Sequence, residues 1–328
     1  MQANDYVIAG GAGFIGSHII RRLLSLGTTG RITVLDDFST GSRMNLKDAS
    51  QDPRLRIREC DVAEVVPDIH PADVVLHLAT CANPKDYEAR ALDTLRVNSQ
   101  GTGNLLRLAR ENESRFVYFS SSEIYGDHDP MPLNGLDEES CPRIHLGKKR
   151  SCYVVGKAFG EELVRAYCSE YEVEYLIVRP FNVYGPNMDW NTPYGRVIPN
   201  FLRWAMMSEP LRVNGDGSQE RSFCFIDDFL DCLFLLLNGQ FPPERTVNIG
   251  NPEPASILEL ANIVNHMTEN CGGIEFVDKY QFEPKYRTPD VRRVMEWTGW
   301  KPKTSLTRGL EKLIGTQERR EIGEEVTV

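Results

Sequence analysis

The stretch GGAGFIGS, residues 10–17, says most about how this chain folds. It follows the apolar run 6–9, which predicts a buried strand, and it leads into a helical pattern at 14–26. The glycines at 11, 13 and 16 form the pattern G-x-G-x-x-G. The first two permit a tight turn close to a pyrophosphate, and the third permits close packing of the helix on the sheet. Free N–H groups at the helix start also favour phosphate. Because the pattern lies between a strand and a helix, it predicts a dinucleotide site rather than a glycine turn without a ligand.

Short apolar strands alternate with helix-length segments through the first half of the chain. Further strands are expected at 32–35, 55–57, 74–78, 116–119 and 175–178, and long helices at 92–110 and 153–171. This order predicts an α/β fold with a Rossmann-type, doubly wound parallel sheet. A smaller mixed α/β C-terminal substrate domain is expected after Arg179-Pro180, where the composition shifts toward Pro, Gly and Asn.

The expected boundaries follow from this pattern. The dinucleotide domain would cover 1–180, with a returning stretch at 222–252 that includes the runs 223–237 and 247–249. The second domain would cover 181–221 and 253–315, and the charged end, 316–328, is expected to form a flexible tail.

Two aspartates bear on the type of dinucleotide. Asp36 ends the second strand, twenty residues after Gly16. A carboxylate there accepts hydrogen bonds from both ribose hydroxyls and repels a 2′-phosphate, which favours NAD over NADP. Asp37 strengthens that preference. Asp61-Val62 follows the third strand, where it either contacts the adenine or serves only as a turn.

Composition narrows the classes of partner. The chain has 328 residues and a net charge of −10, and it has no long basic block, which argues against nucleic acid. The longest apolar stretch, 229–237, contains Asp231 and is too short to cross a membrane. Eight cysteines form no CxxC pair, so neither a metal site nor a disulfide framework is expected. Together with a start that has no signal-peptide pattern, these features predict a cytoplasmic protein.

The segment SCYVVGK, residues 151–157, contains a candidate catalytic pair. Tyr153 and Lys157 are four apart at a predicted helix start, so they lie on one helix face. A free phenol titrates near pH ~10, and a neighbouring ammonium and a positive nicotinamide both favour the phenolate. Tyr153 could then take a proton from a substrate hydroxyl as hydride leaves. Such pairs also arise by chance, but the glycine loop and the serines at 121 and 122 strengthen this one. Cys152 has no basic partner, so packing is expected for it rather than nucleophilic catalysis.

These parts together resemble the extended short-chain dehydrogenase/reductase family, whose members act on nucleotide sugars with tightly held NAD. The resemblance covers nearly the whole chain and includes His77-Leu78-Ala79, VNSQGT at 97–102, RPFNVYGP at 179–186, and RSF followed by Asp227-Asp228. It implies a set of NAD-binding residues: Gly10, Gly13, Phe14, Ile15, Gly16, Asp36, Asp61, Val62, Leu78, Ala79, Asn98, Ser120, Tyr153 and Lys157.

The segment FSSSEIYG, residues 119–126, bears on which reaction follows C4 oxidation. Dehydratases of this family carry Asp-Glu where this chain has Ser122-Glu123, so the acid that removes a hydroxyl is missing. The Ser-Ser-Glu arrangement resembles the UDP-glucuronate decarboxylases of the family. The segments 77–87, 144–157 and 286–290 resemble decarboxylases as well.

The resemblance implies a coherent chemistry. Oxidation at C4 places the C6 carboxylate β to a ketone, so carbon dioxide leaves readily. Tyr153 and Ser121 would stabilise the resulting enolate. Arg287 would hold the substrate, and Glu123 would position the sugar or act as an acid or base. The implied catalytic set is Ser121, Ser122, Glu123, Tyr153, Lys157 and Arg287.

Two departures keep other reactions open. Asn83 stands where decarboxylases commonly carry serine, and Val155-Gly156 replaces an acid-glycine pair. A nucleotide-sugar 4-epimerase or 4,6-dehydratase is therefore an alternative. A protein that senses NAD, or a scaffold on the same fold, is a further alternative, although such proteins usually lose the tyrosine or lysine kept here.

The substrate is expected to be a UDP-sugar, UDP-glucuronate by resemblance. Its expected binding residues are Asn83, Tyr87, Glu123, Arg150, Asn182, Arg196, Val197, Val213, Arg221 and Arg287. Val213 begins a turn at 213–217 that either lines the base pocket or is a plain hairpin. The resemblance also implies a homodimer, in which the helices near 92–108 and 153–171 of each subunit form a four-helix bundle.

Overall fold

The computed structural model describes residues 4–27, 29–67, 69, 71–148, 150–188, 196–239, 245–278 and 284–325, and side chains as far as residue 316. The chain divides into two compact units. Unit 1 comprises Met1–Ile124, Ile144–Pro180 and Leu236–Val247. Unit 2 comprises Tyr125–Arg143, Phe181–Leu235 and Asn248–Val328.

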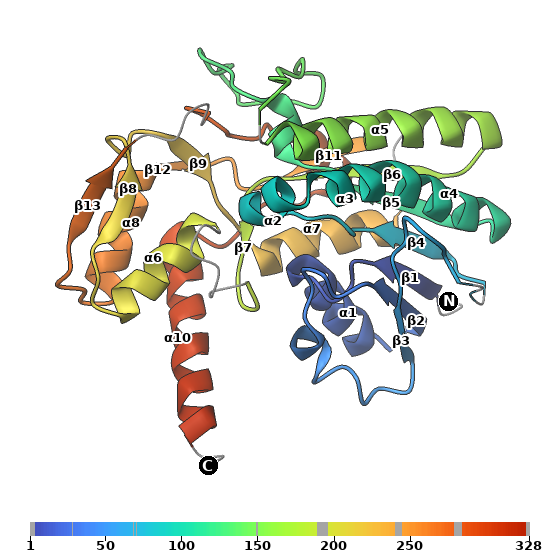
Figure 1. Cartoon of the computed structure of the whole chain (residues 1–328), viewed down its shortest axis with the longest axis horizontal. Coiled ribbons are helices and arrows are strands. Elements are labelled where there is room, and N and C mark those ends of the chain that lie inside the picture. Colours follow the sequence, from blue (N-terminus) through green and yellow to red (C-terminus); the bar gives the residue numbers. More distant parts are fainter. Residues whose placement is uncertain are drawn as a thin grey trace. The chain divides into compact units, whose positions relative to one another are not determined.

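A seven-stranded sheet with the order β11-β6-β5-β4-β1-β2-β3 forms the centre of unit 1 (Figure 1). The pairings that join β1 through β6 are all parallel, which confirms the predicted fold class. The strands are β1 (Asn4–Ala9), β2 (Thr29–Asp36), β3 (Leu55–Glu59), β4 (Val74–His77), β5 (Arg115–Phe119), β6 (Tyr175–Pro180) and β11 (Thr246–Ile249).

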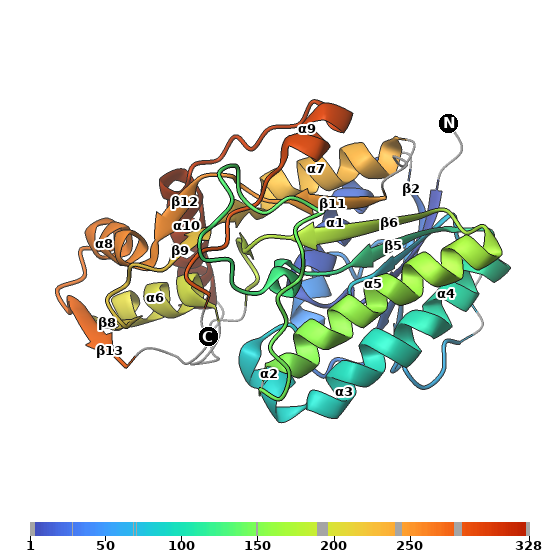
Figure 2. The same ribbon diagram turned by 90° about the horizontal axis from the view of Figure 1, so that it is seen from above.

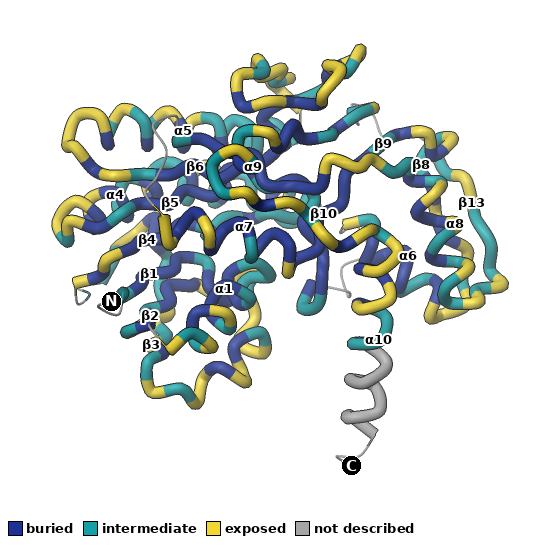
Figure 3. Tube along the Cα trace, turned by 180° about the vertical axis from the view of Figure 1, so that it is seen from behind, coloured by how far each residue is buried: buried dark blue, intermediate teal, exposed yellow. Residues whose placement is uncertain are grey.

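Helices cover both faces of this sheet, as the hydrophobic character of its strands requires. Figure 2 shows α4 and α5 on one face and α1 on the other. The helices of unit 1 are α1 (Phe14–Ser25), α2 (Pro84–Ala89), α3 (Ala91–Arg96), α4 (Thr102–Glu111) and α5 (Ser151–Tyr171). The central strands are buried along most of their length (Figure 3).

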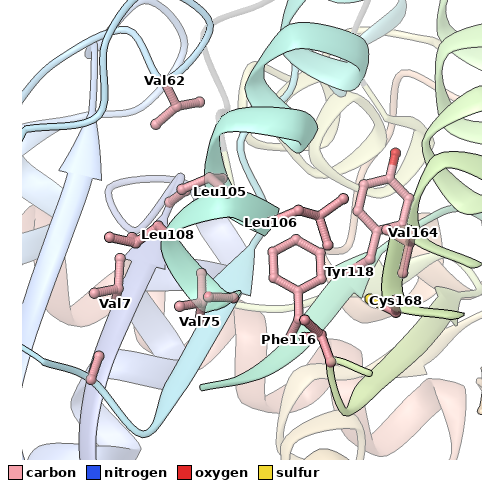
Figure 4. Packing of buried hydrophobic residues seen from close by; sticks show 14 of the residues in the cluster. Val7, Val62, Val75, Leu105, Leu106, Leu108, Phe116, Tyr118, Val164 and Cys168 are labelled. Carbon is pink, nitrogen blue, oxygen red and sulfur yellow. The ribbon is translucent and has the colours of Figure 1, made fainter. Parts of the chain in front are cut away.

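The predicted helix at 92–110 is present as one helical segment whose type changes within it. Between α3 and α4 the backbone forms a π turn at Val97–Gly101, which contains the buried Asn98. Such turns are frequent at functional sites. Beyond it, Leu105 and Leu106 of α4 meet Phe116 of β5 and Val164 of α5 in one apolar cluster (Figure 4).

Unit 2 is built from short strand pairs and helices. The pairs are β7 (Val183–Tyr184) with β10 (Cys224–Phe225), β8 (Leu211–Asn214) with β13 (Ile274–Val277), and β9 (Glu220–Ser222) with β12 (Pro254–Ser256). The helices are α6 (Val197–Met206), α7 (Ile226–Asn238), α8 (Ile257–Met267), α9 (Arg292–Thr298) and α10 (Leu306–Glu325). The boundary between the units falls inside α7 and inside β11.

Two local expectations differ from the structure. β8 does not form a hairpin with β9; it pairs in parallel with β13, about sixty residues further along the chain, so the hairpin alternative at 213–217 is wrong. Residues 223–237 form the short β10 and then α7, whereas Thr246–Ile249 joins the sheet as expected. From Thr316 the chain continues α10 to Glu325, and the flexibility of this segment stays a prediction. In the residues that the structure describes, no helix is both long and apolar enough for a membrane span.

Candidate active site

The carboxyl ends of the parallel strands bring the predicted residues of unit 1 to one edge of the sheet. Ala9, the last residue of β1, is in register with Leu35 of β2 and with His77, the last residue of β4. His77 is in turn aligned with Tyr118 in β5, one residue before the strand ends. This edge is where parallel α/β sheets bind their ligands.

The glycine turn has the features that a pyrophosphate requires. Gly10 has φ +80°, and a Cβ there would lie 2.6 Å from the Ala79 nitrogen, which shows how closely the HLA segment approaches the turn. At Gly16 a Cβ would lie 2.4 Å from the Gly10 oxygen. α1 begins after Gly13 without a side-chain cap and without an acidic residue in its first turn, so its N–H groups are suited to an anion.

Asp36 lies where the sequence predicts it, at the end of β2, and it is buried. Its carboxylate accepts hydrogen bonds from the N–H groups of Ala12 and Phe38, each at 2.9 Å. Burial raises the pKa of this carboxyl, while these two N–H groups act in the opposite direction. The glycine turn and this carboxylate therefore fit the diphosphate and the adenosine ribose of NAD.

The loop after β2 also belongs to this region, and the sequence reasoning missed it. Ser42 donates its N–H to the Ala12 oxygen at 3.1 Å, and the Asn45 amide donates to the same oxygen at 2.9 Å. A Cβ at Gly41 would lie 2.9 Å from the Asp36 carboxylate. The signal was present in the glycine and asparagine that follow the aspartate, because both favour turns.

Asp61 and Val62 make contacts that are explained by local structure and packing alone. The Asp61 carboxylate accepts a hydrogen bond from the Ala63 N–H at 2.8 Å, which is turn chemistry. Val62 is buried in the same apolar cluster as Leu105 and Leu106 of α4 (Figure 4). Their contact with adenine stays a prediction.

Tyr153 lies in a small buried cluster. Its ring stacks on that of Tyr87, with the centroids 4.9 Å apart and the planes 15° from parallel. Cys81 completes the buried part of this cluster, and the Cys152 thiol donates to the Tyr87 carbonyl at 3.3 Å. Burial raises the pKa of the Cys152 thiol, in agreement with a packing role.

Lys157 is buried one helical turn beyond Tyr153 and is 1% exposed. Its ammonium donates to the Phe119 oxygen at 2.6 Å and lies over the Tyr118 ring at 4.9 Å. Burial lowers the pKa of Lys157 to about 7, and the charge of Glu161 acts in the opposite direction. The charge of this lysine is therefore sensitive to its neighbours near neutral pH.

Asn98 is held by hydrogen bonds on both sides of its amide. Its nitrogen donates to the Thr80 hydroxyl at 2.9 Å and to the Thr94 oxygen at 2.8 Å, and its side-chain oxygen accepts from the Tyr118 hydroxyl at 3.1 Å. These three hydrogen bonds occupy the nitrogen and the oxygen of the side-chain amide, so Asn98 helps to hold the π turn in place. Its predicted contact with NAD stays a prediction.

His77, the last residue of β4, is fully buried. It contacts the Thr102 hydroxyl at 3.1 Å. Burial lowers the pKa of His77 to about 3, and the Lys157 charge adds to that effect, so the imidazole is neutral.

Ser120 and Ser121 follow β5, and Ser122 and Glu123 then begin a 3-10 turn. Ser120, Ser121 and Ser122 are buried, whereas Glu123 is half-buried in the turn Ser122–Tyr125. The Ser121 hydroxyl accepts a hydrogen bond from the Glu123 N–H at 3.1 Å. Glu123 also lies close enough to Tyr87 for its charge to raise the pKa of that phenol, although burial is the larger cause.

Asn83 and Arg150 lie near the same cluster. The Asn83 side-chain oxygen caps α2 by accepting from the Lys85 N–H at 3.2 Å. Arg150 pairs with Glu88 at 3.5 Å and acts on the pKa of Tyr87 in the direction opposite to Glu123. Tyr87, Glu123, Arg150 and Tyr153 are therefore brought together within unit 1.

The other predicted substrate residues lie in unit 2. The backbone of Asn182 has φ +37°, and its side-chain amide donates to the Ser222 main-chain oxygen at 2.9 Å. The Arg196 guanidinium donates to the Val183 main-chain oxygen at 3.2 Å. Arg221 is buried and donates to the Glu220 oxygen at 2.7 Å. Arg287 is also buried, while Val197 begins α6 and Val213 is buried in β8.

Comparison with known proteins places these features in a family context. The sequence profile of the NAD dependent epimerase/dehydratase family matches residues 6–250. The chain is 37% identical over 320 residues to UDP-glucuronic acid decarboxylase 2 of Arabidopsis thaliana, covering 97% of this chain and 69% of the relative. It is 35% identical over 308 residues to UDP-glucuronic acid decarboxylase 1 of Xenopus tropicalis, covering 94% and 70%.

A solved structure shares the fold. The UDP-glucuronic acid 4-epimerase of Bacillus cereus, in complex with UDP-glucuronic acid and NAD, superposes with a TM-score of 0.82 at 25% identity. The match covers 94% of this chain and 97% of that one.

Proposed function

Since the chain belongs to the NAD dependent epimerase/dehydratase family, we propose that it is an NAD-dependent UDP-glucuronate decarboxylase. The observation that carries the proposal is the similarity, over nearly the whole of this chain, to relatives named UDP-glucuronic acid decarboxylases, together with the Ser-Ser-Glu segment at 121–123. The products would be carbon dioxide with UDP-xylose, in which case NAD is regenerated, or carbon dioxide with the UDP-4-keto-pentose and NADH, or both.

NAD, when bound, accepts a hydride from C4 of the sugar and can return it later. Gly10, Gly13, Phe14, Ile15 and Gly16 would hold its diphosphate, and Asp36 its adenosine ribose. Tyr153 would take the proton from the C4 hydroxyl. Lys157 favours the phenolate because a positive charge stabilises a nearby negative one. The stack on Tyr87 fixes the plane of the Tyr153 ring, so its oxygen has a defined direction.

The resulting 4-keto sugar loses its C6 carboxylate as carbon dioxide, and the electrons of the C5–C6 bond pass into an enolate. Tyr153 and the Ser121 hydroxyl would stabilise the enolate oxygen by hydrogen bonds. A proton then returns to C5. Glu123, half-buried and close to Tyr87, would position the sugar or take part in that transfer.

Epimerisation at C4 is the second candidate, supported by the similarity to the epimerase that binds UDP-glucuronic acid and NAD. Both reactions begin with the same oxidation, so the fate of C6 distinguishes them. Ser122 stands where a 4,6-dehydratase carries the aspartate that acts as the acid. Dehydration is therefore the weaker alternative.

The nucleotide would be bound by residues of unit 2. We assign the UDP part of the substrate to Asn182, Arg196, Val197, Val213, Arg221 and Arg287. Arginine suits a diphosphate because its planar fork donates several hydrogen bonds at once.

A homodimer is also part of the proposal. Large apolar side chains are exposed on α3 and α5, among them Leu92 at 69% and Phe159 at 52%. Burial of exposed apolar side chains against a second subunit stabilises a helix. A four-helix bundle formed by α3–α4 and α5 of two subunits would bury these side chains. The structure describes all eight cysteines, and none is in a disulfide. Thiols persist in a reducing compartment, and we propose the cytoplasm as the location.

Proton NMR of the protein with UDP-glucuronate and an equal amount of NAD tests the proposed function. Decarboxylation replaces the H5 signal with C5 methylene signals, and the C4 signals then distinguish UDP-xylose from the 4-keto pentose. The appearance of UDP-galacturonate with C6 retained would establish the epimerase instead. An unchanged spectrum would exclude UDP-glucuronate as the substrate.

A further inference from the structure

The Lys157 ammonium lies in the core of unit 1, where a charge needs partners. Two groups of β5 contact it: the Phe119 oxygen accepts a hydrogen bond at 2.6 Å, and the ammonium lies over the Tyr118 ring, 4.9 Å from its centroid. Tyr118 is fully buried against α5 (Figure 4). A cation within ~6 Å of an aromatic centroid is attracted by the ring face, more strongly where water is excluded. This contact joins Tyr118, which the proposed reaction leaves without a role, to the lysine.

The Tyr118 ring is fixed by contacts around its edge. Its hydroxyl donates to the Asn98 side-chain oxygen at 3.1 Å. The imidazole of His77 packs edge-on against the ring, with the centroids 5.5 Å apart and the planes at 64°. A Cβ at Gly160 of α5 would overlap the phenol oxygen, so this glycine leaves the space that the hydroxyl occupies. The ring face therefore has one defined position under the ammonium.

We propose that Tyr118 is a positioning residue for Lys157: the face of its ring holds the ammonium in place on the side of α5 that carries Tyr153. It would act through Lys157 and would not touch the substrate. The inference goes beyond the proposed function, and it rests on that function only in giving Lys157 its work beside Tyr153.

A ring face suits this role because of how it attracts a cation. An ammonium has three N–H donors, and the Phe119 oxygen takes one of them. The ring attracts the charge as a whole, so the other donors stay available to NAD, which Lys157 is expected to bind. A leucine would fill core space without attracting the charge. Packing alone therefore does not require an aromatic ring at this position.

Two other ionisable groups near this ammonium are accounted for in other ways. Burial lowers the pKa of His77, so its imidazole is neutral. The Glu161 carboxylate accepts hydrogen bonds from Arg179 at 2.8 and 2.7 Å and from Arg165 at 2.7 Å, so two arginines compensate its charge. Among the residues that the structure describes, the contacts that hold the lysine are those made by β5.

The contact itself is tested by NMR without cofactor or substrate. Protons above an aromatic face resonate upfield, so the Lys157 ε-methylene protons should give an upfield signal in protein labelled with ¹³C-lysine. Lys157→Met identifies that signal by removing it. The upfield shift should be kept in Tyr118→Phe and lost in Tyr118→Leu. A wild-type Lys157 signal at the ordinary lysine position, or an upfield signal kept in Tyr118→Leu, overturns the inference.

The effect on the reaction is tested by weakening the ring face at nearly constant volume. Tyr118→Phe is compared with forms in which the same phenylalanine carries one, two or three ring fluorines, because each fluorine weakens the attraction for a cation. All of them lack the hydroxyl, so the Asn98 oxygen is left equally unpaired throughout. With the NAD-loaded protein and UDP-glucuronate, kcat should fall in steps, to about a tenth of the Tyr118→Phe value with three fluorines, while KM changes little. A flat series overturns the inference.

A matched control and a second variant separate this role from folding. The same series at Tyr6, a buried tyrosine in the first half of β1, should leave kcat unchanged. Tyr118→Leu leaves a void, so it is also combined with Gly160→Ala, which returns a methyl group to the space vacated by the phenol. This double variant should fold and lose about tenfold in kcat relative to Tyr118→Phe. A double variant that does not fold overturns the inference, because the phenol would then serve mainly to hold the structure together.

Failure of the proposed function gives a different result. If the wild type does not turn over UDP-glucuronate, the substrate assignment is wrong, whereas the NMR result stands because it uses neither substrate nor NAD. The fluorine series is then measured with UDP-glucose or dTDP-glucose, whichever reduces the bound NAD. A stepwise fall supports the inference there too, and a flat series overturns it.

Discussion

Unit 1 and unit 2 hold their predicted site residues by different kinds of contact. In unit 1 the side chains contact one another or the ends of the sheet: Tyr153 stacks on Tyr87, and Lys157 donates to the Phe119 oxygen. In unit 2 the hydrogen bonds described for Asn182 and Arg221 go to nearby main-chain carbonyls. Under the proposed function, this difference predicts that unit 1 fixes the reacting groups in advance, whereas unit 2 presents groups for recognition. Changes at the buried Tyr153 and Lys157 of unit 1 should therefore act on kcat, and changes at the arginines of unit 2 should act on KM for the sugar nucleotide.

The largest effect is expected for Tyr153→Phe. The phenyl ring keeps the stack on Tyr87 but has no oxygen to take the C4 proton, so kcat should fall by about 10³-fold with little change in melting temperature. The measurement is NADH formation and product release at saturating substrate. Tyr171→Phe, the same change further along α5, is the control and should keep full activity. A loss smaller than about tenfold would show that Tyr153 is not the proton acceptor.

A second large effect in unit 1 concerns the cofactor. Asp36→Asn removes the charge that would accept the ribose hydroxyls, so affinity for NAD should fall by about 10- to 100-fold, with kcat at saturating NAD nearly kept. The preference for NAD over NADP should also narrow. Calorimetry with both dinucleotides measures these changes, and Asp48→Asn, at an exposed position after β2 to which no role in NAD binding is assigned, is the control. Unchanged affinity would place the ribose away from Asp36.

The buried lysine gives a prediction about stability. The pKa of Lys157 is lowered by burial from 10.5 to about 7, so between these values the unfolded chain binds more protons than the folded one. Lys157 therefore makes the free energy of unfolding rise with pH from about 7 to 10, by an amount on the order of 1–3 kcal/mol.

Lys157→Met removes that contribution. Denaturation by urea at several pH values should show a flatter dependence in the variant than in the wild type, even though the variant loses activity. An equally steep dependence in both proteins would mean that Lys157 keeps an ordinary pKa in the folded state.

The smallest effect is expected in unit 2. Arg221→Met should raise KM for the sugar nucleotide about tenfold, through loss of charge-assisted hydrogen bonds, and should leave kcat and NAD affinity nearly unchanged. Steady-state kinetics measure KM and kcat, and NAD titration measures the affinity for NAD. Arg212→Met, at an exposed arginine of the same unit, is the control. A fall in kcat with KM unchanged would contradict the division between the two units.

Much of the fold could be predicted from the sequence because its signals are local. Apolar strands alternate with helical patterns, and GGAGFIGS marks the first strand-to-helix turn. The parallel sheet follows from these signals alone. The partner of β8 could not be predicted in this way. β13 lies about sixty residues away, and no local sequence pattern in either strand indicates its pairing partner.

The candidate site shows the same limit. The spacing of Tyr153 and Lys157 and the position of Asp36 are local features, and the structure puts these residues where they were expected. The stack of Tyr87 on Tyr153 depends on how α2 packs against α5, and the pair Glu161–Arg179 joins a helix to a strand. Neither contact has a sequence spacing that reveals it, so both emerge only from the packed structure.

The fate of the C6 carbon distinguishes the proposed reaction from epimerisation. UDP-glucuronate labelled with ¹³C at C6 is incubated with the NAD-loaded protein, and the label is followed by ¹³C NMR, with Tyr153→Phe as the control. We predict that the label appears as carbon dioxide and bicarbonate with the wild type, and remains in the sugar with the variant. Turnover of the substrate with the label kept in the sugar would contradict the decarboxylase assignment.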